Sequence, residues 1–289
     1  MKLIQRIVLK YYILKFKLIE FVSPSTAAKA AFELFCTPYT KRRNYPEPTV
    51  FSKAEKLSFK CEDNKINGFR WQPQTSSHRK VLICHGFDSN SYKFEQYIDP
   101  LLQNGFEVFA FDAPAHGISS GKTITALLYR NMIMKAHDDY GPFYAIIAHS
   151  FGGIATALTI EELQDDHQLK KIVLIAPATE TTRSLNDFCK YLQISSRLKQ
   201  EMEKLITSIA GKPAEWYSVA RIVQSITIPT LWIHDRYDKI TPYEDMEFLT
   251  QKNLPAVTFM ITEGLGHSLY NDDNVAGEIL TFISETSSK

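Results

Sequence analysis

The chain has few cysteines and almost no net charge. Its 289 residues include four cysteines, which lie far apart and form no C-x-x-C pair. This spacing argues against a thiolate metal site and a disulfide scaffold, so we expect reduced thiols in a cytoplasmic protein. The formal net charge of +1 argues against a nucleic-acid partner. The sequence also has no phosphate-binding or dinucleotide-binding glycine motif and no metal-ligand cluster, so we expect neither a cofactor nor a metal.

Long uncharged apolar runs are missing as well. The first 22 residues are rich in apolar side chains, but five charged residues interrupt them: Arg6, Lys10, Lys15, Lys17 and Glu20. A membrane span needs ~20 apolar residues, and no small-residue cleavage site follows a compact apolar region. We therefore expect neither a span nor a signal peptide. The overall composition, 44% hydrophobic and 22% charged, is that of a globular protein.

Residues 1–49 are expected to form a basic helical arm and a linker. Residues 1–43 carry nine basic and two acidic side chains, a net charge of +7, whereas the rest of the chain has a net charge of −6. Apolar residues recur every three or four positions, which predicts an amphipathic helix; they are Ile4, Ile7, Tyr11, Leu14, Leu18 and Phe21. Pro24 ends this helix and Ser25 caps a second one over residues 26–35, followed by a linker over 38–48.

Two interpretations of residues 1–22 stay open. Most of the polar side chains fall on the face opposite the apolar stripe. In the first interpretation, the apolar stripe of the helix packs on the rest of the chain or on the second subunit of a homodimer. In the second, the helix lies on an anionic membrane. In the second case the protein is peripheral to the inner face of the membrane.

The remaining sequence alternates between strand and helix patterns. A hairpin of two short strands is expected around Asp63 and Asn64. Six continuous apolar runs then predict buried parallel strands: 81–84, 106–111, 143–148, 172–175, 230–233 and 257–261. Helical patterns lie between them: 91–102, 123–137, 152–163, 243–251 and 274–283. The fold class is therefore α/β, with a mostly parallel sheet of about eight strands and helices on both faces.

Residues 178–226 interrupt this alternation, since they contain helical patterns and no strand. Such an insertion is expected over the carboxyl edge of the sheet, where open α/β folds bind their ligands. We interpret it as a helical lid that lines an apolar pocket. An ordinary packing excursion is the alternative.

The sequence A-H-S-F-G at 148–152 has the features of a nucleophile elbow. It directly follows a predicted strand and opens a predicted helix, so the turn would present the Ser150 hydroxyl above the sheet. Ala148 stands where a glycine is usual, and a single methyl group is tolerable there. A serine needs a base to become a nucleophile, and here the expected order is serine, acid, histidine.

His267 is the expected base because it lies in a glycine-containing loop after the last predicted strand. Asp238 is the expected acid, since Pro242 opens the following helix, and Asp235 is the weaker alternative. His149, next to the serine, is expected to hydrogen-bond locally.

The oxyanion of a tetrahedral intermediate needs two N–H donors. We expect them from the backbone amides of Phe87, in the H-G-F loop after the strand ending at Cys84, and Phe151. A second loop, D-A-P-A-H-G at 112–117, resembles an active site, but we interpret it as loop architecture in which Asp112 accepts backbone hydrogen bonds.

Together, the elbow, the H-G loop, the acid turn and the late histidine resemble the α/β-hydrolase superfamily over residues 50–285. The closest likeness is to bacterial serine hydrolases of the esterase and lipase type with a helical cap. The resemblance implies a core of residues 50–177 and 227–289, a cap of residues 178–226, and a catalytic triad of Ser150, Asp238 and His267. It also implies an acyl-enzyme that water hydrolyses.

These expectations favour a carboxylesterase whose substrate is a small hydrophobic ester with an apolar acyl or small aromatic group. Two alternatives stay open. The basic arm suggests a lysophospholipase or acylglycerol lipase at a membrane surface. A non-catalytic ligand-binding protein on a hydrolase fold is the third possibility, and other serine-triad chemistries, including acyl transfer, share the same motifs.

Overall fold

The computed structural model describes residues 3–39, 46–74 and 79–285. The chain divides into two compact units. A helical unit combines Met1–Thr37 with Glu180–Ser218, and a sheet unit combines Pro38–Thr179 with Val219–Lys289. Most of the predicted linker, at residues 40–45, lies outside the described residues.

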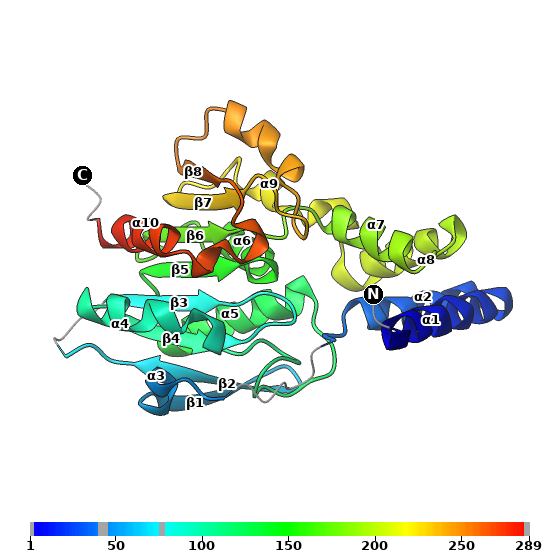
Figure 1. Cartoon of the computed structure of the whole chain (residues 1–289), viewed down its shortest axis with the longest axis horizontal. Coiled ribbons are helices and arrows are strands. Elements are labelled where there is room, and N and C mark those ends of the chain that lie inside the picture. The colour runs from blue at the N-terminus through cyan, green and yellow to red at the C-terminus, as the bar shows by residue number, and fades with distance from the viewer. Residues whose placement is uncertain (1–2, 40–45, 75–78, 286–289) are drawn as a thin grey trace. The chain divides into compact units, whose positions relative to one another are not determined.

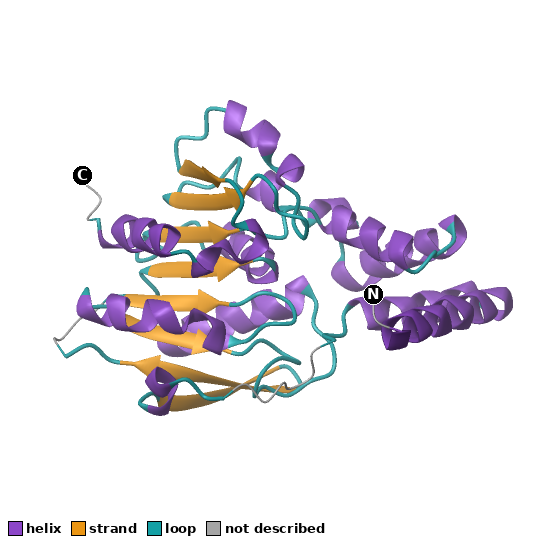
Figure 2. Cartoon of the chain, in the orientation of Figure 1, coloured by secondary structure: helices purple, strands orange, loops and turns teal. Residues whose placement is uncertain are grey.

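The sheet unit contains one eight-stranded sheet in the order β1-β2-β4-β3-β5-β6-β7-β8 (Figure 2). β2 runs antiparallel to both of its neighbours, β1 and β4, and all other neighbouring strands are parallel, so the prediction of a mostly parallel sheet of about eight strands is confirmed. The strands are β1 (Glu55–Cys61), β2 (Asn64–Trp71), β3 (Lys80–Cys84), β4 (Glu107–Phe111), β5 (Ala145–His149), β6 (Lys171–Ile175), β7 (Thr230–Asp235) and β8 (Val257–Thr262).

Strands β4 to β7 are buried along their whole length, which explains their unbroken apolar runs. Helices cover both faces of the sheet, with α4 and α10 on one face and α5 and α6 on the other (Figure 1). The helices of this unit are α3 (Thr49–Ser52), α4 (Glu95–Gln103), α5 (Ala126–Tyr140), α6 (Phe151–Glu162), α9 (Val219–Ile222) and α10 (Asp273–Ser284).

One helix expected from the sequence, over 243–251, is instead two short 3₁₀ helices, η3 (Tyr243–Asp245) and η4 (Glu247–Gln251). Met246 lies between them with a φ of −123°, outside the helical range, and this interrupts the helix. The other 3₁₀ helices are η1 (Ser91–Phe94), η2 (Ala214–Trp216) and η5 (Gly266–Asn271).

The helical unit joins the basic arm to the insertion. Its helices are α1 (Leu3–Val22), α2 (Pro24–Phe35), α7 (Thr181–Tyr191) and α8 (Ser196–Ala210). They share one apolar core, so two segments that are remote in the sequence fold together; its buried residues include Phe16, Ala27, Ala28, Ala31, Leu185, Leu198, Met202 and Ile206. The interpretation of the insertion as a lid stays a prediction.

The start of α2 differs from the sequence-based expectation. Pro24 is the first residue of the helix and Ser23, rather than Ser25, is its N-cap, with the Thr26 N–H donating to Ser23 Oγ at 3.3 Å. Proline suits this position because the first helical N–H has no intrahelical partner. None of the helices in the described ranges is both long and apolar enough to cross a membrane.

Candidate active site

Ser150 lies at the tip of a sharp turn between β5 and α6. Its φ of +53° and ψ of −117° are unusual for a residue with a side chain. Backbone hydrogen bonds hold the turn, because Ser150 N–H donates to Ile175 at 3.0 Å and the Ser150 carbonyl accepts from Ala178 at 2.9 Å. A strained serine between a parallel strand and a helix is the geometry of a nucleophile elbow.

Small residues allow neighbouring chain segments to approach this turn. A Cβ on Gly152 would lie 2.6 Å from the carbonyl oxygens of Cys84 and His85, and one on Gly153 would lie 2.6 Å from Pro177 Cβ. These distances are too short for any side chain. The α6 N-terminus can therefore lie against the end of β3 because residue 152 is glycine, and against Pro177, after β6, because residue 153 is glycine.

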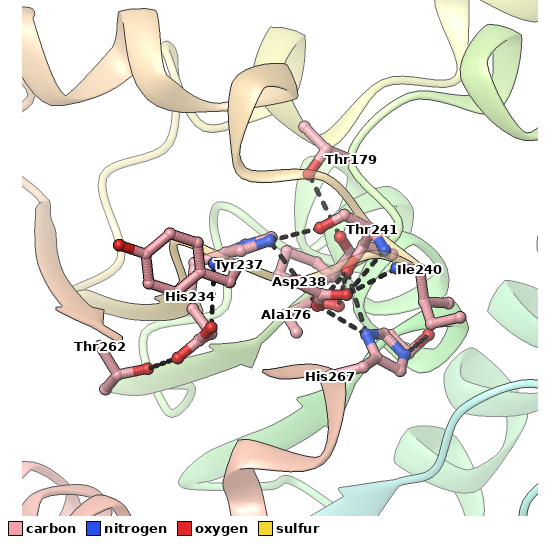
Figure 3. Close-up of polar contacts among 12 residues, drawn as sticks. Ala176, Thr179, His234, Tyr237, Asp238, Ile240, Thr241, Thr262 and His267 are labelled. Atoms are coloured by element: carbon pink, nitrogen blue, oxygen red, sulfur yellow. Dashed lines mark hydrogen bonds and ion pairs between the residues drawn. The ribbon is translucent and has the colours of Figure 1, made fainter. Parts of the chain in front are cut away.

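A chain of hydrogen bonds links Ser150 to two side chains from other loops. His267, at the start of η5 after β8, has its Nε2 2.9 Å from Ser150 Oγ. Its Nδ1 lies 2.7 Å from Asp238 Oδ2, and Figure 3 shows this contact in the turn after β7. All three loops follow the carboxyl ends of parallel strands, where α/β proteins place their ligand sites. The three residues expected from the sequence are thus brought together.

Asp238 is buried and fully satisfied. Its Oδ1 accepts the Ile240 N–H at 2.8 Å and the Thr241 N–H at 3.1 Å, and its Oδ2 accepts the Thr241 hydroxyl at 2.9 Å (Figure 3). Burial alone would raise the pKa of Asp238, but its interactions with His267 and with the two backbone amides outweigh burial and lower the pKa to about 2. Asp238 is therefore an anion at neutral pH.

An anionic Asp238 defines the tautomer of His267. A carboxylate can only accept a hydrogen bond, so Nδ1 carries the proton and Nε2 presents its lone pair to the Ser150 hydroxyl. This is the arrangement in which an imidazole can remove a proton from serine.

The alternative acid, Asp235, has a different role. Its carboxylate accepts the backbone amides of Tyr237 and Leu265 and the Thr262 hydroxyl, each at 2.9 Å. Burial raises its pKa, but these donors outweigh burial and lower it. Asp235 therefore ties the turn that carries Asp238 to the loop that carries His267.

His149 contacts the base through its backbone. His149 Nε2–H donates to the His267 carbonyl at 2.9 Å, and the two rings lie 4.7 Å apart between centroids. Burial, together with the neighbouring imidazole of His267, lowers the pKa of His149 to about 3, so His149 is neutral at physiological pH. It hydrogen-bonds locally, as its position in the elbow indicates.

The hydrogen bonds of Thr241 and His234 in the turn that carries Asp238 were not predicted from the sequence. Thr241 donates to Asp238, and buried His234 donates from Nε2 to the Thr241 carbonyl at 2.7 Å. The signal that could have found Thr241 is a hydroxyl residue three positions after the acid, since such spacing suits a side-chain-capped turn.

The two expected oxyanion donors lie beside the serine. The rings of Phe87 and Phe151 meet edge to face with centroids 5.5 Å apart. Neither of their amide N–H groups has a hydrogen-bond partner among the residues that the structure describes. Gly86 brings this loop close, since a Cβ there would lie 3.0 Å from Ser150 Cβ. The role of these two amides as oxyanion donors stays a prediction.

The second loop is architectural. Asp112 accepts the Ser91 N–H at 2.8 Å and the Ile118 N–H at 2.8 Å. Gly117, with a φ of +46°, is required because a Cβ would fall 1.9 Å from the Asp112 carboxylate. Within the described ranges, no group of three histidine, cysteine or acidic side chains is placed to hold a metal ion.

Comparison with known proteins identifies the superfamily. The family profile described as "Serine aminopeptidase, S33" matches residues 75–219, about half of the chain. An uncharacterized abhydrolase domain-containing protein from Dictyostelium discoideum is 22% identical over 74% of this chain. The chain spans only 27% of that protein. YqkD, an uncharacterized protein from Bacillus subtilis, is 22% identical over 76% of this chain and 75% of its own length.

Solved structures show the same fold. The Pyrococcus furiosus esterase Pf2001 is similar with a TM-score of 0.61 at 20% identity, covering 86% of this chain and 97% of that one. The esterase EaEST from Exiguobacterium antarcticum has a TM-score of 0.58 at 15% identity, covering 80% of this chain and 100% of that one. The match of the family profile to half of the chain, together with this fold, shows that the chain belongs to the S33 serine aminopeptidase family within the α/β-hydrolase superfamily.

Proposed function

We propose that this hydrolase is a carboxylesterase that cleaves small hydrophobic esters through an acyl-enzyme on Ser150. The observation that carries the proposal is the hydrogen-bonded series Asp238–His267–Ser150, with distances of 2.7 and 2.9 Å. Its order and tautomer are those that convert a serine hydroxyl into a nucleophile.

In the first half of the reaction, His267 Nε2 takes the proton of Ser150 as Oγ attacks the ester carbonyl. The amides of Phe87 and Phe151 stabilise the oxyanion, and His267, now positively charged next to anionic Asp238, donates its proton to the leaving alcohol. In the second half, His267 activates water, which attacks the acyl group and releases the acid. His267 thus passes the serine proton to the alcohol in the first half and a proton from water to Ser150 Oγ in the second, and it is neutral again after each half.

Apolar side chains next to the site support a hydrophobic substrate. Tyr237 and Ile240 flank Asp238 and are 60% and 67% exposed, and Leu265, two residues before His267, is 39% exposed. Exposed apolar side chains in the loops that carry a polar centre are typical of a ligand-binding surface. The fold shared with esterases agrees with this substrate class.

Labelling with a fluorophosphonate probe tests the proposal, because such probes react with a serine only when base and oxyanion donors are assembled. We expect the wild type to be labelled, Ser150→Ala and His267→Ala not to be, and the exposed-serine control Ser225→Ala to behave as wild type. A panel of p-nitrophenyl esters graded by acyl length then measures turnover.

Three results would overturn the proposal. Ester turnover by Ser150→Ala would show that Ser150 is not the nucleophile. Faster cleavage of aminoacyl p-nitroanilides than of any ester would show that the protein is a peptidase and not an esterase. Peptidase activity is the one that the family description suggests. A folded wild type that is neither labelled nor active would favour a binding protein on a hydrolase fold.

A further inference from the structure

Helix α1 has two apolar faces, and the helical unit uses only one of them. Leu9, Tyr12, Phe16 and Ile19 pack toward α2, and Phe16 is 2% exposed. The opposite stripe comprises Ile4, Ile7, Tyr11, Leu14, Leu18 and Phe21, and we call it the outer stripe. One of the two interpretations of the sequence packed these residues on the rest of the chain or on a second subunit, and the structure of the single chain leaves them exposed.

The outer stripe is continuous and strongly exposed. Its least exposed members are Ile7, Tyr11 and Leu14 at 59%, while Phe21, near the end of the helix, is 92% exposed. Their spacing of three and four residues aligns them along most of the 20-residue helix. A contiguous apolar surface of this kind on a folded protein marks a contact with something outside the chain.

The charges beside the outer stripe identify the partner. The sequence-based placement of the polar side chains on the opposite face is corrected here, because that face holds Phe16. Arg6, Lys10 and Lys17 each directly precede a stripe residue and so lie along one edge of the stripe, and Lys15 follows Leu14 along the other edge. Every charged residue that borders the stripe is therefore basic, and the partner should be anionic.

The single acidic side chain of α1, Glu20, points to the protein side. Glu20 accepts a hydrogen bond from the Ser195 hydroxyl, the N-cap of α8. Its negative charge is thus used inside the helical unit and is turned away from the basic edges of the stripe.

We propose that the outer stripe of α1 docks the protein onto an anionic lipid surface. The helix would lie in the plane of the interface, with its apolar side chains among the acyl chains and its lysine and arginine side chains among the anionic headgroups. Basic edges on an apolar stripe are the pattern of interfacial helices, and the five charged residues of α1 prevent it from crossing the bilayer.

A second copy of the chain fits the stripe less well. In a paired helix the residues bordering the apolar seam face those of the partner. Lys10, Lys15 and Lys17 occupy these positions, so either orientation of two such helices would bring lysine against lysine. This repulsion, and the absence of a compensating acid on the outer edges of α1, favours the anionic surface.

Sedimentation of the full chain with vesicles tests the proposal. The vesicles are phosphatidylcholine alone or an equimolar mixture with phosphatidylglycerol. We expect binding to the anionic vesicles that weakens as salt is added. The double variant Leu14→Gln/Leu18→Gln should bind about tenfold more weakly or worse, and Lys10→Gln/Lys17→Gln should lose its preference for anionic lipid.

A matched control uses Ile209→Gln on α8 of the same unit, because Ile209 is 60% exposed and Leu18 is 61% exposed. This variant should bind as wild type, and circular dichroism should show unchanged helix content in all variants. Ser150→Ala should also bind as wild type, so the outcome is separable from that of the proposed function.

Three results would overturn the proposal. The first is a wild type that stays in the supernatant with anionic vesicles. The second is equal binding by Leu14→Gln/Leu18→Gln. The third is a dimer in analytical ultracentrifugation that the double variant abolishes while vesicle binding is unchanged, which would assign the stripe to a second copy of the chain.

Discussion

Replacing Asp238 by asparagine tests the tautomer argument directly, because the surrounding donors dictate how the new side chain must sit. Two backbone amides, from Ile240 and Thr241, donate to Oδ1. Only an oxygen atom can accept from them, so the asparagine carbonyl takes this position and its NH₂ group takes the place of Oδ2, next to His267 Nδ1.

The NH₂ group would donate to Nδ1 and so place the imidazole proton on Nε2. In that tautomer Nε2 has no lone pair for the Ser150 proton, and the base is lost although every heavy atom stays in place. We expect kcat to fall about 10⁴-fold, equivalent to about 5 kcal/mol of transition-state stabilisation.

A purely electrostatic role for Asp238 predicts a smaller effect. The lowering of its pKa from 3.8 to about 2 is the net result after burial has opposed it, and it corresponds to roughly 2 kcal/mol. A change of that size in the activation free energy would be about thirtyfold in rate. Steady-state hydrolysis of a p-nitrophenyl ester distinguishes the loss of about 10⁴-fold in kcat expected from the tautomer argument from the loss of about thirtyfold expected from a purely electrostatic role. A loss of less than about a hundredfold would refute the tautomer argument.

Asp235→Asn is the matched control for this experiment. Asp235 makes no hydrogen bond to His267 and instead accepts from Tyr237, Leu265 and Thr262. The variant should lower the melting temperature and reduce kcat far less than Asp238→Asn does. Equal losses in kcat would mean that both acids act on the base only through the loop.

Two further predictions concern the same site. His149→Phe keeps an aromatic ring but removes the donor to the His267 carbonyl; kcat should fall about tenfold at constant KM, and His149→Gln, which retains a donor, should recover part of it. Because the pKa of Asp238 is lowered to about 2 in the folded protein, its anion contributes stability above pH ~4 that is lost as pH falls toward about 2. Urea unfolding at several pH values should therefore show that the difference in free energy of unfolding between wild type and Asp238→Asn shrinks as the pH falls from ~4 to about 2. A difference that does not depend on pH would contradict this contribution of the Asp238 anion.

The sequence predicts the sheet well because each buried strand corresponds to one continuous run of apolar residues. Strands β4 to β7 are covered on both faces, so no polar residue interrupts their central positions and the apolar runs stand out. The elbow is equally local, since its strand, strained serine and small flanking residues lie within eight positions of one another.

Hydrogen bonds across the site are less visible in the sequence. Asp235 and Asp238 are three residues apart with similar neighbours, and only the fold shows that one reaches His267 and the other the backbone of Leu265. The contribution of Thr241 likewise depends on the turn that brings its hydroxyl within 2.9 Å of Asp238. These contacts follow from loop conformation, which apolar periodicity does not encode.

The helical unit shows the same limit for apolar patterns. Periodicity reports that a helix has an apolar face, but not which partner covers it, and α1 has two such faces. The structure buries the face with Phe16 because α2 offers three buried alanines, Ala27, Ala28 and Ala31, whose small side chains admit a large ring. The other face holds more apolar side chains and stays exposed. A stripe that survives in solvent beside four basic residues is explained by a partner outside the chain, and an anionic lipid surface satisfies both its apolar and its charged parts.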